Sequence, residues 1–255
     1  MDNANRRVKR GWMNLKVIKS ITETHDTQTF TMVDADESGR PWDYWAGQYL
    51  TFRFDNVSEK PAVRSYTMSS SPNQGEICAF TVKRVEKGLI SNWLCDNVKE
   101  GSILRARGPI GRFIYEVEKD RPHLVMVAAG SGVTPFVSIM REFSNKLGQP
   151  GAPKRMTLLV SYRSRQDLIL NEDLQKISKA PGCKVIITLS RDPNAPNEFW
   201  QGRISGDMIV KAVDDEFSNC TFMSCGPTAI MNLTGDVARS KGVPPEQIKD
   251  ESFES

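Results

Sequence analysis

The segment RSYTMSSSP, residues 64–72, places an arginine, a tyrosine and several hydroxyl side chains on one predicted strand. A strand that only filled a core would favour valine or isoleucine at such positions. A guanidinium binds anions, a phenol offers a flat face with a polar tip, and hydroxyls donate and accept hydrogen bonds. The segment therefore predicts a binding strand for a ligand that is part anion and part aromatic ring; a polar edge strand is the alternative.

A second stretch, AAGSGVTPF at residues 128–136, places glycines where an apolar strand ends and a helix begins. Pro135 is expected at the first helical position, where its missing N–H costs nothing. Backbone amides at such a turn can approach a pyrophosphate, and the helix N-terminus favours negative charge. Pro135 occupies the last glycine position of GxGxxG, so the motif is incomplete. Taken alone, it is as compatible with a tight strand-to-helix connection as with a phosphate-binding turn.

The motif SCGP at residues 224–227 follows the last apolar run of the same half of the chain. Ligands of parallel sheets bind beyond the carboxyl ends of the strands. Gly130–Pro135 and Cys225–Pro227 are therefore expected to line one crevice. The alternative for Cys225 is a small buried side chain before a turn.

These motifs must be positioned by the surrounding helices and strands, and the secondary-structure pattern of the sequence changes once along the chain. Up to about residue 118, short runs rich in Val, Ile, Thr and aromatic residues alternate with turn signals, which indicates an antiparallel barrel or sandwich. One helix is expected at Leu89–Asn97, with Ser91 as its cap. The expected strands contain LKVIKSI, TQTFTMV, QYLTFRF, RSYTMSS, ICAFTVKR and ILRARGPI.

After residue 121 a strand pattern is followed by a helix pattern, four times in succession. This alternation predicts a parallel sheet covered by helices on both faces. The strands contain HLVMVAAG, MTLLVSY, KVIITLS and CTFMSCG, and the helices PFVSIMREFSNKL, NEDLQKISKA, SGDMIVKAV and PTAIMNLTGDVARSK.

The 255 residues carry a net charge of +3 and are 39% hydrophobic, enough for one large domain or two ordinary ones. Such a balance argues against nucleic acid or an anionic membrane as a ligand. The basic run Arg6–Arg10 is expected to be a solvated tail, with contact to an acidic partner as the alternative. Neither a membrane span nor a signal peptide is expected, so the predicted location is cytoplasmic.

Five scattered cysteines and two histidines do not form a metal-binding or disulfide pattern. An iron-sulfur cluster would need four grouped thiolates, which the spacing does not supply. No metal site is therefore predicted, and redox chemistry would have to come from an organic cofactor.

Read in order, RSYT, VKRVEKGLIS, GPIGRF, AAGSGVTP, SCGP and the closing ESF resemble the ferredoxin-NADP reductase superfamily of flavoproteins from about residue 13 onward. The sequence is most similar to the reductase modules of bacterial oxygenases and of the hybrid cluster protein. The resemblance implies a six-stranded antiparallel FAD-binding β-barrel at 13–118 and a Rossmann-like NAD(P)-binding domain at 119–250. Residues 1–12 would form a flexible basic tail, and residues 251–255 a tail that covers the flavin.

The resemblance also implies which residues bind the flavin. Arg64 would pair with its phosphate, Tyr66 would lie against the ring system or ribityl chain, and Thr67 would bond near N5. A pyrophosphate held between Arg64 and the start of the helix favours FAD over FMN. The full set of implied flavin contacts is Arg64, Ser65, Tyr66, Thr67, Val82, Lys83, Gly88, Leu89, Ile90, Ser91 and Phe253.

On the nucleotide side, Thr134 would sit close to flavin and nicotinamide, and Cys225 near nicotinamide C4. Thr67, Cys225, Glu251 and Phe253 are the expected catalytic residues, with Phe253 moving off the flavin ring before nicotinamide binds. Arg163, Ser190 and Arg191 would bind the adenosine end, and a 2'-phosphate there would make NADPH rather than NADH the donor. The implied nucleotide contacts are Gly130, Gly132, Thr134, Pro135, Arg163, Ser190, Arg191, Cys225, Gly226 and Pro227.

The expected function is an NAD(P)H-dependent flavoprotein reductase that passes single electrons to a [2Fe-2S] ferredoxin or an iron-sulfur oxygenase component. A free-flavin or quinone reductase and a non-catalytic flavin- or nucleotide-binding regulatory subunit are the alternatives. Related modules often continue into a ferredoxin domain, whereas this sequence ends at Ser255. Either a separate acceptor takes the electrons or the chain is a fragment of a longer protein. A monomer is expected.

Overall fold

The computed structural model describes residues 6–253 and divides the chain into two compact units between Ile114 and Tyr115. The boundary was predicted a few residues later, after 118. Residues 1–5 and 254–255, which belong to the predicted N-terminal and C-terminal tails, lie outside the described residues. Among the described residues, no helix is both long and apolar enough to cross a membrane.

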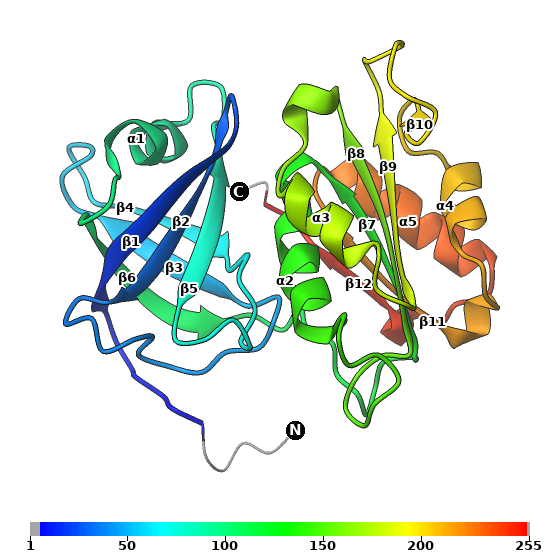
Figure 1. Cartoon of the computed structure of the whole chain (residues 1–255), viewed down its shortest axis with the longest axis horizontal. Coiled ribbons are helices and arrows are strands. Elements are labelled where there is room, and N and C mark those ends of the chain that lie inside the picture. Colours follow the sequence, from blue (N-terminus) through cyan, green and yellow to red (C-terminus); the bar gives the residue numbers. More distant parts are fainter. Residues whose placement is uncertain (1–5, 254–255) are drawn as a thin grey trace. The chain divides into compact units, whose positions relative to one another are not determined.

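The first unit is a six-stranded antiparallel sheet, as predicted (Figure 1), and its strand order is β4-β3-β6-β1-β2-β5. A single antiparallel bridge between Met68 and Phe80 joins the two edge strands and so closes the sheet into a barrel. The strands are β1 Met13–Thr24, β2 Thr27–Asp34, β3 Tyr49–Phe54, β4 Ala62–Thr67, β5 Cys78–Lys83 and β6 Ile103–Ile110.

The barrel interior is filled by the apolar side chains that alternate along these strands. Phe80 packs between Phe30 and Phe52, with ring centroids 5.4 and 4.5 Å away. The helix α1 (Leu89–Asn97) has the predicted bounds, and it inserts Ile90 and Leu94 into the same core. The core therefore fixes β4 and α1, the two elements expected to bind the flavin.

Ser91 does not cap this helix, so that prediction was wrong. The residue before the helix is Gly88, which makes no side-chain capping bond. The buried Oγ of Ser91 instead accepts a hydrogen bond from the backbone N–H of Val85, at 3.1 Å. Ser91 thus holds the turn that precedes the helix.

The second unit is a six-stranded sheet in which every pairing is parallel, with the order β10-β9-β8-β7-β11-β12. This confirms the predicted α/β architecture. Its strands are β7 His123–Ala129, β8 Arg155–Tyr162, β9 Cys183–Leu189, β10 Trp200–Gln201, β11 Cys220–Cys225 and β12 Ile248–Glu251. Its α-helices are α2 Thr134–Phe143, α3 Asn171–Ile177, α4 Gly206–Ala212 and α5 Thr228–Ser240.

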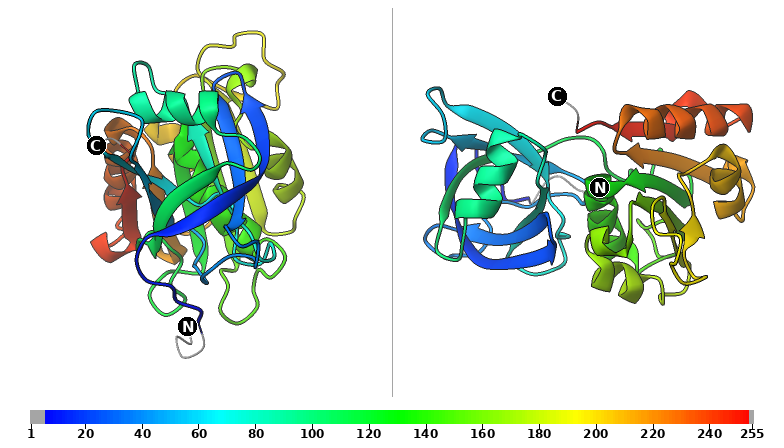
Figure 2. Two further views of the ribbon diagram at one scale, coloured as in Figure 1. Left: turned by 90° about the vertical axis from the view of Figure 1, so that its left-hand side faces the viewer. Right: turned by 90° about the horizontal axis from the view of Figure 1, so that it is seen from above.

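Helices cover both faces of this sheet (Figure 2). On β7, Val125 and Val127 join one apolar cluster with α4 and α5, while α2 and α3 pack together on the other face. A strand buried on both faces reads as a continuous apolar run, as β7 does. The strand order reverses between β7 and β11, and such a switch point is where parallel sheets bind ligands.

Two boundaries in this unit differ from those predicted. Glu251 belongs to β12 and pairs in register with Cys225, so the predicted tail cannot begin before Ser252. The helix α2 begins at Thr134 after a 3-10 turn at Gly130–Val133, which makes Pro135 its second residue rather than its first. Proline is tolerated throughout the first helical turn because those N–H groups have no intrahelical acceptor.

The described part of the basic N-terminal segment makes ion pairs, in contrast to a wholly solvated tail. Arg7 pairs with Asp43 at 2.9 Å and with Glu76 at 2.7 Å. Lys9 pairs with Asp34 at 2.6 Å. These contacts lay the segment along the barrel of the first unit.

Candidate flavin and nucleotide sites

The strand β4 presents two of the predicted flavin residues on one face. Arg64 is exposed, and its Nη1 donates to the neighbouring carbonyl of Val63 at 2.7 Å. Among the residues that the structure describes, no carboxylate lies within ion-pair distance of its guanidinium. A solvated arginine with no acidic partner retains its donors for an anion such as phosphate.

Tyr66, two residues along the same face, is mostly buried. Its ring lies 6.0 Å from that of Phe52 and 5.4 Å from that of Phe80. Burial raises the pKa of its hydroxyl, so the phenol stays protonated and can donate a hydrogen bond. An aromatic face next to a free guanidinium on one strand is the arrangement that the opening motif predicts.

The hydroxyl side chains of the RSYTMSSSP segment divide into two groups. Thr67 is 4% exposed at the end of β4, and Ser65 lies 3.1 Å from Thr51 through their Oγ atoms. Beyond β4, the Oγ of Ser69 accepts a bond from Thr81, and that of Ser70 accepts a bond from the N–H of Ala79. The serines after Thr67 therefore hold the barrel together, and the ligand-binding interpretation is left to Arg64–Thr67.

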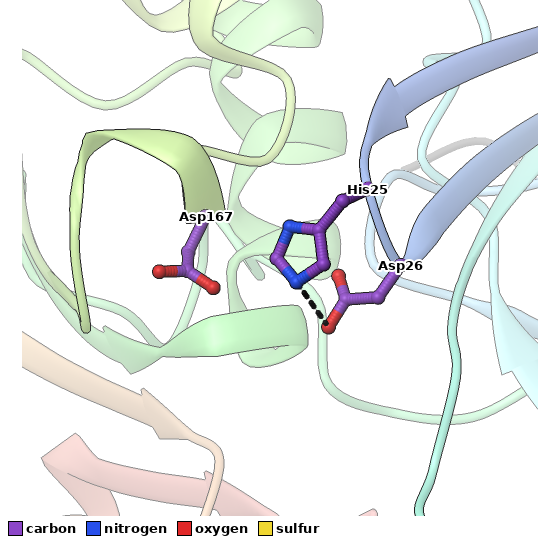
Figure 3. A group of neighbouring side chains, drawn as sticks. All are labelled: His25, Asp26 and Asp167. Carbon is purple, nitrogen blue, oxygen red and sulfur yellow. Dashed lines mark ion pairs between the residues drawn. The ribbon is translucent and has the colours of Figure 1, made fainter.

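Val82 and Lys83, predicted to contact the flavin through their backbones, end β5. Val82 is fully buried, while the Nζ of Lys83 forms an ion pair with Asp26 at 2.6 Å. Asp26 also lies 3.7 Å from His25 in the turn after β1 (Figure 3). The Lys83 side chain is thus engaged within the barrel, which is consistent with a role for its backbone only.

The start of α1 supplies amides for an anion. Gly88 is tightly enclosed, since a Cβ there would lie 2.7 Å from the Oγ of Ser91. The N–H groups of Leu89, Ile90 and Ser91 come next, and the first amides of a helix have no intrahelical acceptor. Together with the helix dipole they favour a phosphate oxygen. Trp93 of α1 and Tyr66 of β4 pack against the same core, which holds these two elements in fixed positions.

In the second unit, the two predicted nucleotide motifs meet. A Cβ on Gly132 would lie 2.2 Å from the carbonyl oxygen of Cys225, so only glycine permits this approach. Gly226 has φ +138°, and its own Cβ would meet Ala129 at 3.2 Å. Gly130 has φ +55° and open space beside it, which leaves its surroundings accessible to a ligand. The glycine turn and SCGP therefore form one structure at the carboxyl ends of β7 and β11.

Thr134 and Cys225 are both inaccessible to bulk solvent. Thr134 is 2% exposed, and its Oγ1 donates to the carbonyl of Ser131 at 3.0 Å. Burial, with a smaller contribution from Glu251, raises the pKa of the Cys225 thiol. The sulfur is therefore a neutral packing group rather than a thiolate nucleophile, which fits a role in positioning a ring. Pro135 and Pro227 stand at the starts of α2 and α5.

The predicted adenosine residues lie beyond β8 and β9. The backbone N–H of Arg191 donates to the carbonyl of Arg163 at 2.7 Å, and Ser190 donates to Tyr162 at 3.0 Å. Arg191 lines a depression of about 470 Å³ whose other lining residues include Arg165 and Asp192. This is the edge of the sheet where a dinucleotide would extend.

Sequence reasoning missed the ion pair between Arg165 and Asp192, at 2.7 Å, which forms one wall of this depression. A reciprocal capping arrangement between Ser164 and Asp167 fixes the adjoining turn. The charged run RSRQD after a strand was the available signal. Arg165 holds the Asp192 carboxylate, and among the described residues the guanidinium of Arg191 has no ion-pair partner.

Phe253 follows β12 and is 43% exposed. Glu251, two residues earlier, ends that strand beside Cys225. The exposed ring is available to cover a ligand, and this role remains a prediction. The residues present fit both expected ligands. The barrel offers contacts for the phosphate and the aromatic ring of a flavin, and the parallel sheet offers contacts for the pyrophosphate of a nucleotide.

Comparison with known proteins assigns most of each unit to a domain family. Residues 14–115 match the oxidoreductase FAD-binding domain family, and residues 126–236 match the oxidoreductase NAD-binding domain family. The chain belongs to the ferredoxin reductase-like oxidoreductases, which combine an FAD-binding domain with an NAD-binding domain. FAD is accordingly the flavin, and NAD(P)H the nucleotide.

Two curated relatives and one solved structure illustrate the similarity. The reductase subunit of glycine betaine monooxygenase from Chromohalobacter salexigens is 31% identical over 95% of this chain and 64% of its own length. The NADH oxidoreductase HCR of Escherichia coli is 29% identical over 87% of this chain and 62% of its own length. The chain thus spans less than two thirds of either relative. The FAD/NAD-binding domain of a nitric oxide dioxygenase from Vibrio cholerae superposes with a TM-score of 0.81 at 25% identity, covering 94% of this chain and 98% of its own.

Proposed function

We propose that this chain oxidises NADPH or NADH and passes the electrons through FAD to a one-electron acceptor protein. The observation that carries the proposal is the contact between Gly132 and Cys225. This contact brings the glycine turn, which is proposed to bind phosphate, beside a buried, neutral thiol at the switch point of the parallel sheet. The same chain carries a flavin-binding barrel, and FAD, when bound, supplies the conversion of one two-electron transfer into two one-electron transfers.

The residues of the barrel bind and orient the flavin. Arg64 and the first amides of α1 neutralise the phosphates, because guanidinium and helix N-terminus both favour anions. Tyr66 offers its flat face and a protonated hydroxyl. Thr67, small and held at the end of β4, would offer the flavin a hydrogen bond without blocking access to its ring system.

The residues of the second unit position the nicotinamide. Thr134 and Cys225 are held by buried backbone and have little freedom, so each fixes a ring without chemistry of its own. Orientation of two reactants can supply several kcal/mol of a barrier. Glu251 adds a carboxylate beside Cys225, and Phe253 is the proposed movable cover.

NADPH is the proposed donor. Ser190 and Arg191 end β9, and the Arg191 guanidinium borders the depression beside the paired Arg165 and Asp192. A guanidinium without an acidic partner favours a 2'-phosphate over a hydroxyl. Arg163 would add a second positive charge next to the same edge.

A [2Fe-2S] ferredoxin or an iron-sulfur oxygenase component is the proposed acceptor, in the cytoplasm, with a monomeric reductase. The support is that the relatives named above include a monooxygenase reductase subunit. A reductase that holds its flavin as a substrate would release that flavin during purification, and a regulatory subunit would not turn over.

The deciding experiment is an anaerobic titration of the purified protein. NADPH and NADH are added separately, the loss of flavin absorbance is followed, and oxidised ferredoxin is then added. We expect retention of the yellow cofactor, bleaching by nucleotide and recovery on addition of ferredoxin. Retained flavin that neither nucleotide bleaches would reject the proposal.

A further inference from the structure

A groove of about 430 Å³ lies wholly within the first unit, between the N-terminal segment and the end of β6. Among the described residues, five cationic side chains line it, and Asp43 is the one carboxylate. These cations are Arg6, Arg7, Lys9, Arg10 and Arg107. We call this surface the basic groove; the flavin and nucleotide residues described above do not line it.

The residues that the structure describes neutralise only part of the positive charge of the basic groove. Asp43 is already bonded to Arg7 and lies 3.3 Å from Arg40. Among residues 6–253, neither Arg10 nor Arg107 has a carboxylate within ion-pair distance, and the same holds for Arg6. The Nη2 atom of Arg6 is buried and has no hydrogen-bond partner in the described part of the chain. Burial lowers the pKa of Arg6, as expected for a cation that lacks full compensation.

Two of these arginines stack on tryptophans. The guanidinium carbon of Arg6 lies 3.7 Å from the ring centroid of Trp45, and that of Arg107 lies 4.9 Å from that of Trp12. Val8, two residues after Arg6 in the N-terminal segment, is 73% exposed. Arginine and tryptophan are enriched in protein–protein interfaces, and here they lie beside an exposed apolar side chain. A site for a small phosphate would need the arginines but not the tryptophans.

The strand register places the basic groove near the flavin-binding strand. Tyr49 of β3 pairs with Thr67 on one side and with Ile110, which lines the groove, on the other. Two neighbouring strand spacings amount to about 10 Å. A protein seated in the groove would therefore lie a short distance from the residue proposed to contact the reacting edge of the flavin.

We propose that the basic groove docks the acidic face of the protein that takes electrons from the flavin. This inference rests on the proposed function and adds to it the docking surface and the charge of the partner. Complementary charge would steer the encounter and raise the association rate, and salt would weaken it.

The test compares two variants of the whole flavin-loaded protein with equal changes in net charge. The variant R6E/R10E/R107E reverses three charges in the groove. The matched control K19E/K60E/K99E reverses three exposed lysines of the same unit that do not line the groove. The acceptor probe is an acidic plant-type [2Fe-2S] ferredoxin, and uncharged menadione reports the flavin half of the reaction. Calorimetric titration with oxidised ferredoxin measures binding without turnover.

We expect the groove variant to raise the KM and Kd for ferredoxin at least 10-fold and to flatten their dependence on salt. Menadione reduction should stay within about twofold of wild type, and the control should shift the KM for ferredoxin less than threefold. The milder R6Q/R10Q/R107Q should show an intermediate loss, which answers any folding defect of the reversed variant.

Equal losses in both charge-reversal variants would overturn the inference, because net charge alone would then explain them. An unchanged Kd in the groove variant would overturn it as well. Wild-type protein that reduces menadione but neither binds nor reduces the ferredoxin also counts against it. Failure of the proposed function looks different, since wild-type protein would then reduce neither menadione nor ferredoxin with either nucleotide.

Discussion

Gly132 approaches the backbone of Cys225 so closely that a single methyl group at Gly132 would lie 2.2 Å from the Cys225 carbonyl oxygen. Neither backbone can move easily, because Gly132 belongs to the 3-10 turn after β7 and Cys225 ends β11, which is hydrogen-bonded to β7 on one side and β12 on the other. The contact joins two motifs that are almost a hundred residues apart in the sequence.

Gly132→Ala should therefore destabilise the protein by about 1–3 kcal/mol, the usual cost of overpacking, and weaken nucleotide binding. Urea-unfolding midpoints and a titration with NADP⁺ would measure both effects. Gly235→Ala in α5 is the control, since its Cβ would meet only the mobile end of Arg239 and alanine favours a helix. Wild-type stability in the Gly132 variant would contradict the geometry.

Arg64→Ala should lower the affinity for FAD about 10-fold or more, because a charge-assisted contact contributes ~1.5–3 kcal/mol. The flavin-to-protein ratio after gel filtration and a fluorescence titration of the apoprotein would show it. Arg53→Ala on the neighbouring strand, where Arg53 pairs with Asp55, should leave flavin content unchanged. Full occupancy in both variants would remove Arg64 from the site.

Cys225→Ala should slow flavin reduction by the nucleotide at least 10-fold and change the Kd of that nucleotide less than threefold. The reason is that a positioning loss acts on the transition state more than on binding. Stopped-flow reduction at several nucleotide concentrations separates the two quantities. Cys183→Ala, at the far end of the second unit's sheet, is the matched control; equal behaviour of both variants would return Cys225 to a packing role.

Arg191→Ala should reduce kcat/KM for NADPH about 10-fold or more and leave that for NADH nearly unchanged, through loss of a contact of ~1.5–3 kcal/mol to the 2'-phosphate. Steady-state kinetics with both nucleotides would test this. The exposed Arg203→Ala should affect neither. A wild-type preference for NADH would reject the assignment of NADPH.

Acid should destabilise the second unit through His123. This residue is 1% exposed at the start of β7, with Thr157, Cys220, Asp215 and Arg155 around it. Burial, and then Arg155, lower its pKa below 6.5. The unfolded chain therefore binds this proton more readily than the folded chain does. The contribution of neutral His123 to the free energy of unfolding is fully present above about pH 6.5. Below that pH the free energy of unfolding decreases, by at most ~1.4 kcal/mol per pH unit.

His123→Gln should flatten this dependence between about pH 5 and 7, where histidines titrate and most carboxylates do not. Urea midpoints across that range give the measurement, with His25→Gln in the exposed β1–β2 turn as control. An unchanged slope in the His123 variant would show that another group is responsible.

Much of this fold could be predicted because its strands carry strong patterns. The barrel strands alternate, β7 is a continuous apolar run, and α1 has the predicted bounds. The short strands β10 and β12 were missed, since two to four residues carry almost no periodic signal. The barrel closure at Met68 and Phe80 depends on a tertiary contact that no local pattern records.

The candidate site was predictable where backbone geometry demands a residue type and less so where side chains choose partners. Gly132 and Gly226 fall under the first case. Ser91 falls under the second, because its hydroxyl could cap the helix or hold the preceding turn, and only the folded turn decides. The pairing of Arg165 with Asp192 likewise depends on how two loops meet.

The bridge between Met68 and Phe80 has a consequence for solubility. An open antiparallel sheet exposes rows of unpaired N–H and C=O groups that recruit strands from other molecules. In the first unit that bridge joins the two edge strands, and in the second unit the outermost strands span only two and four residues. Both units therefore offer little template for intermolecular strand pairing, which protects the protein against aggregation.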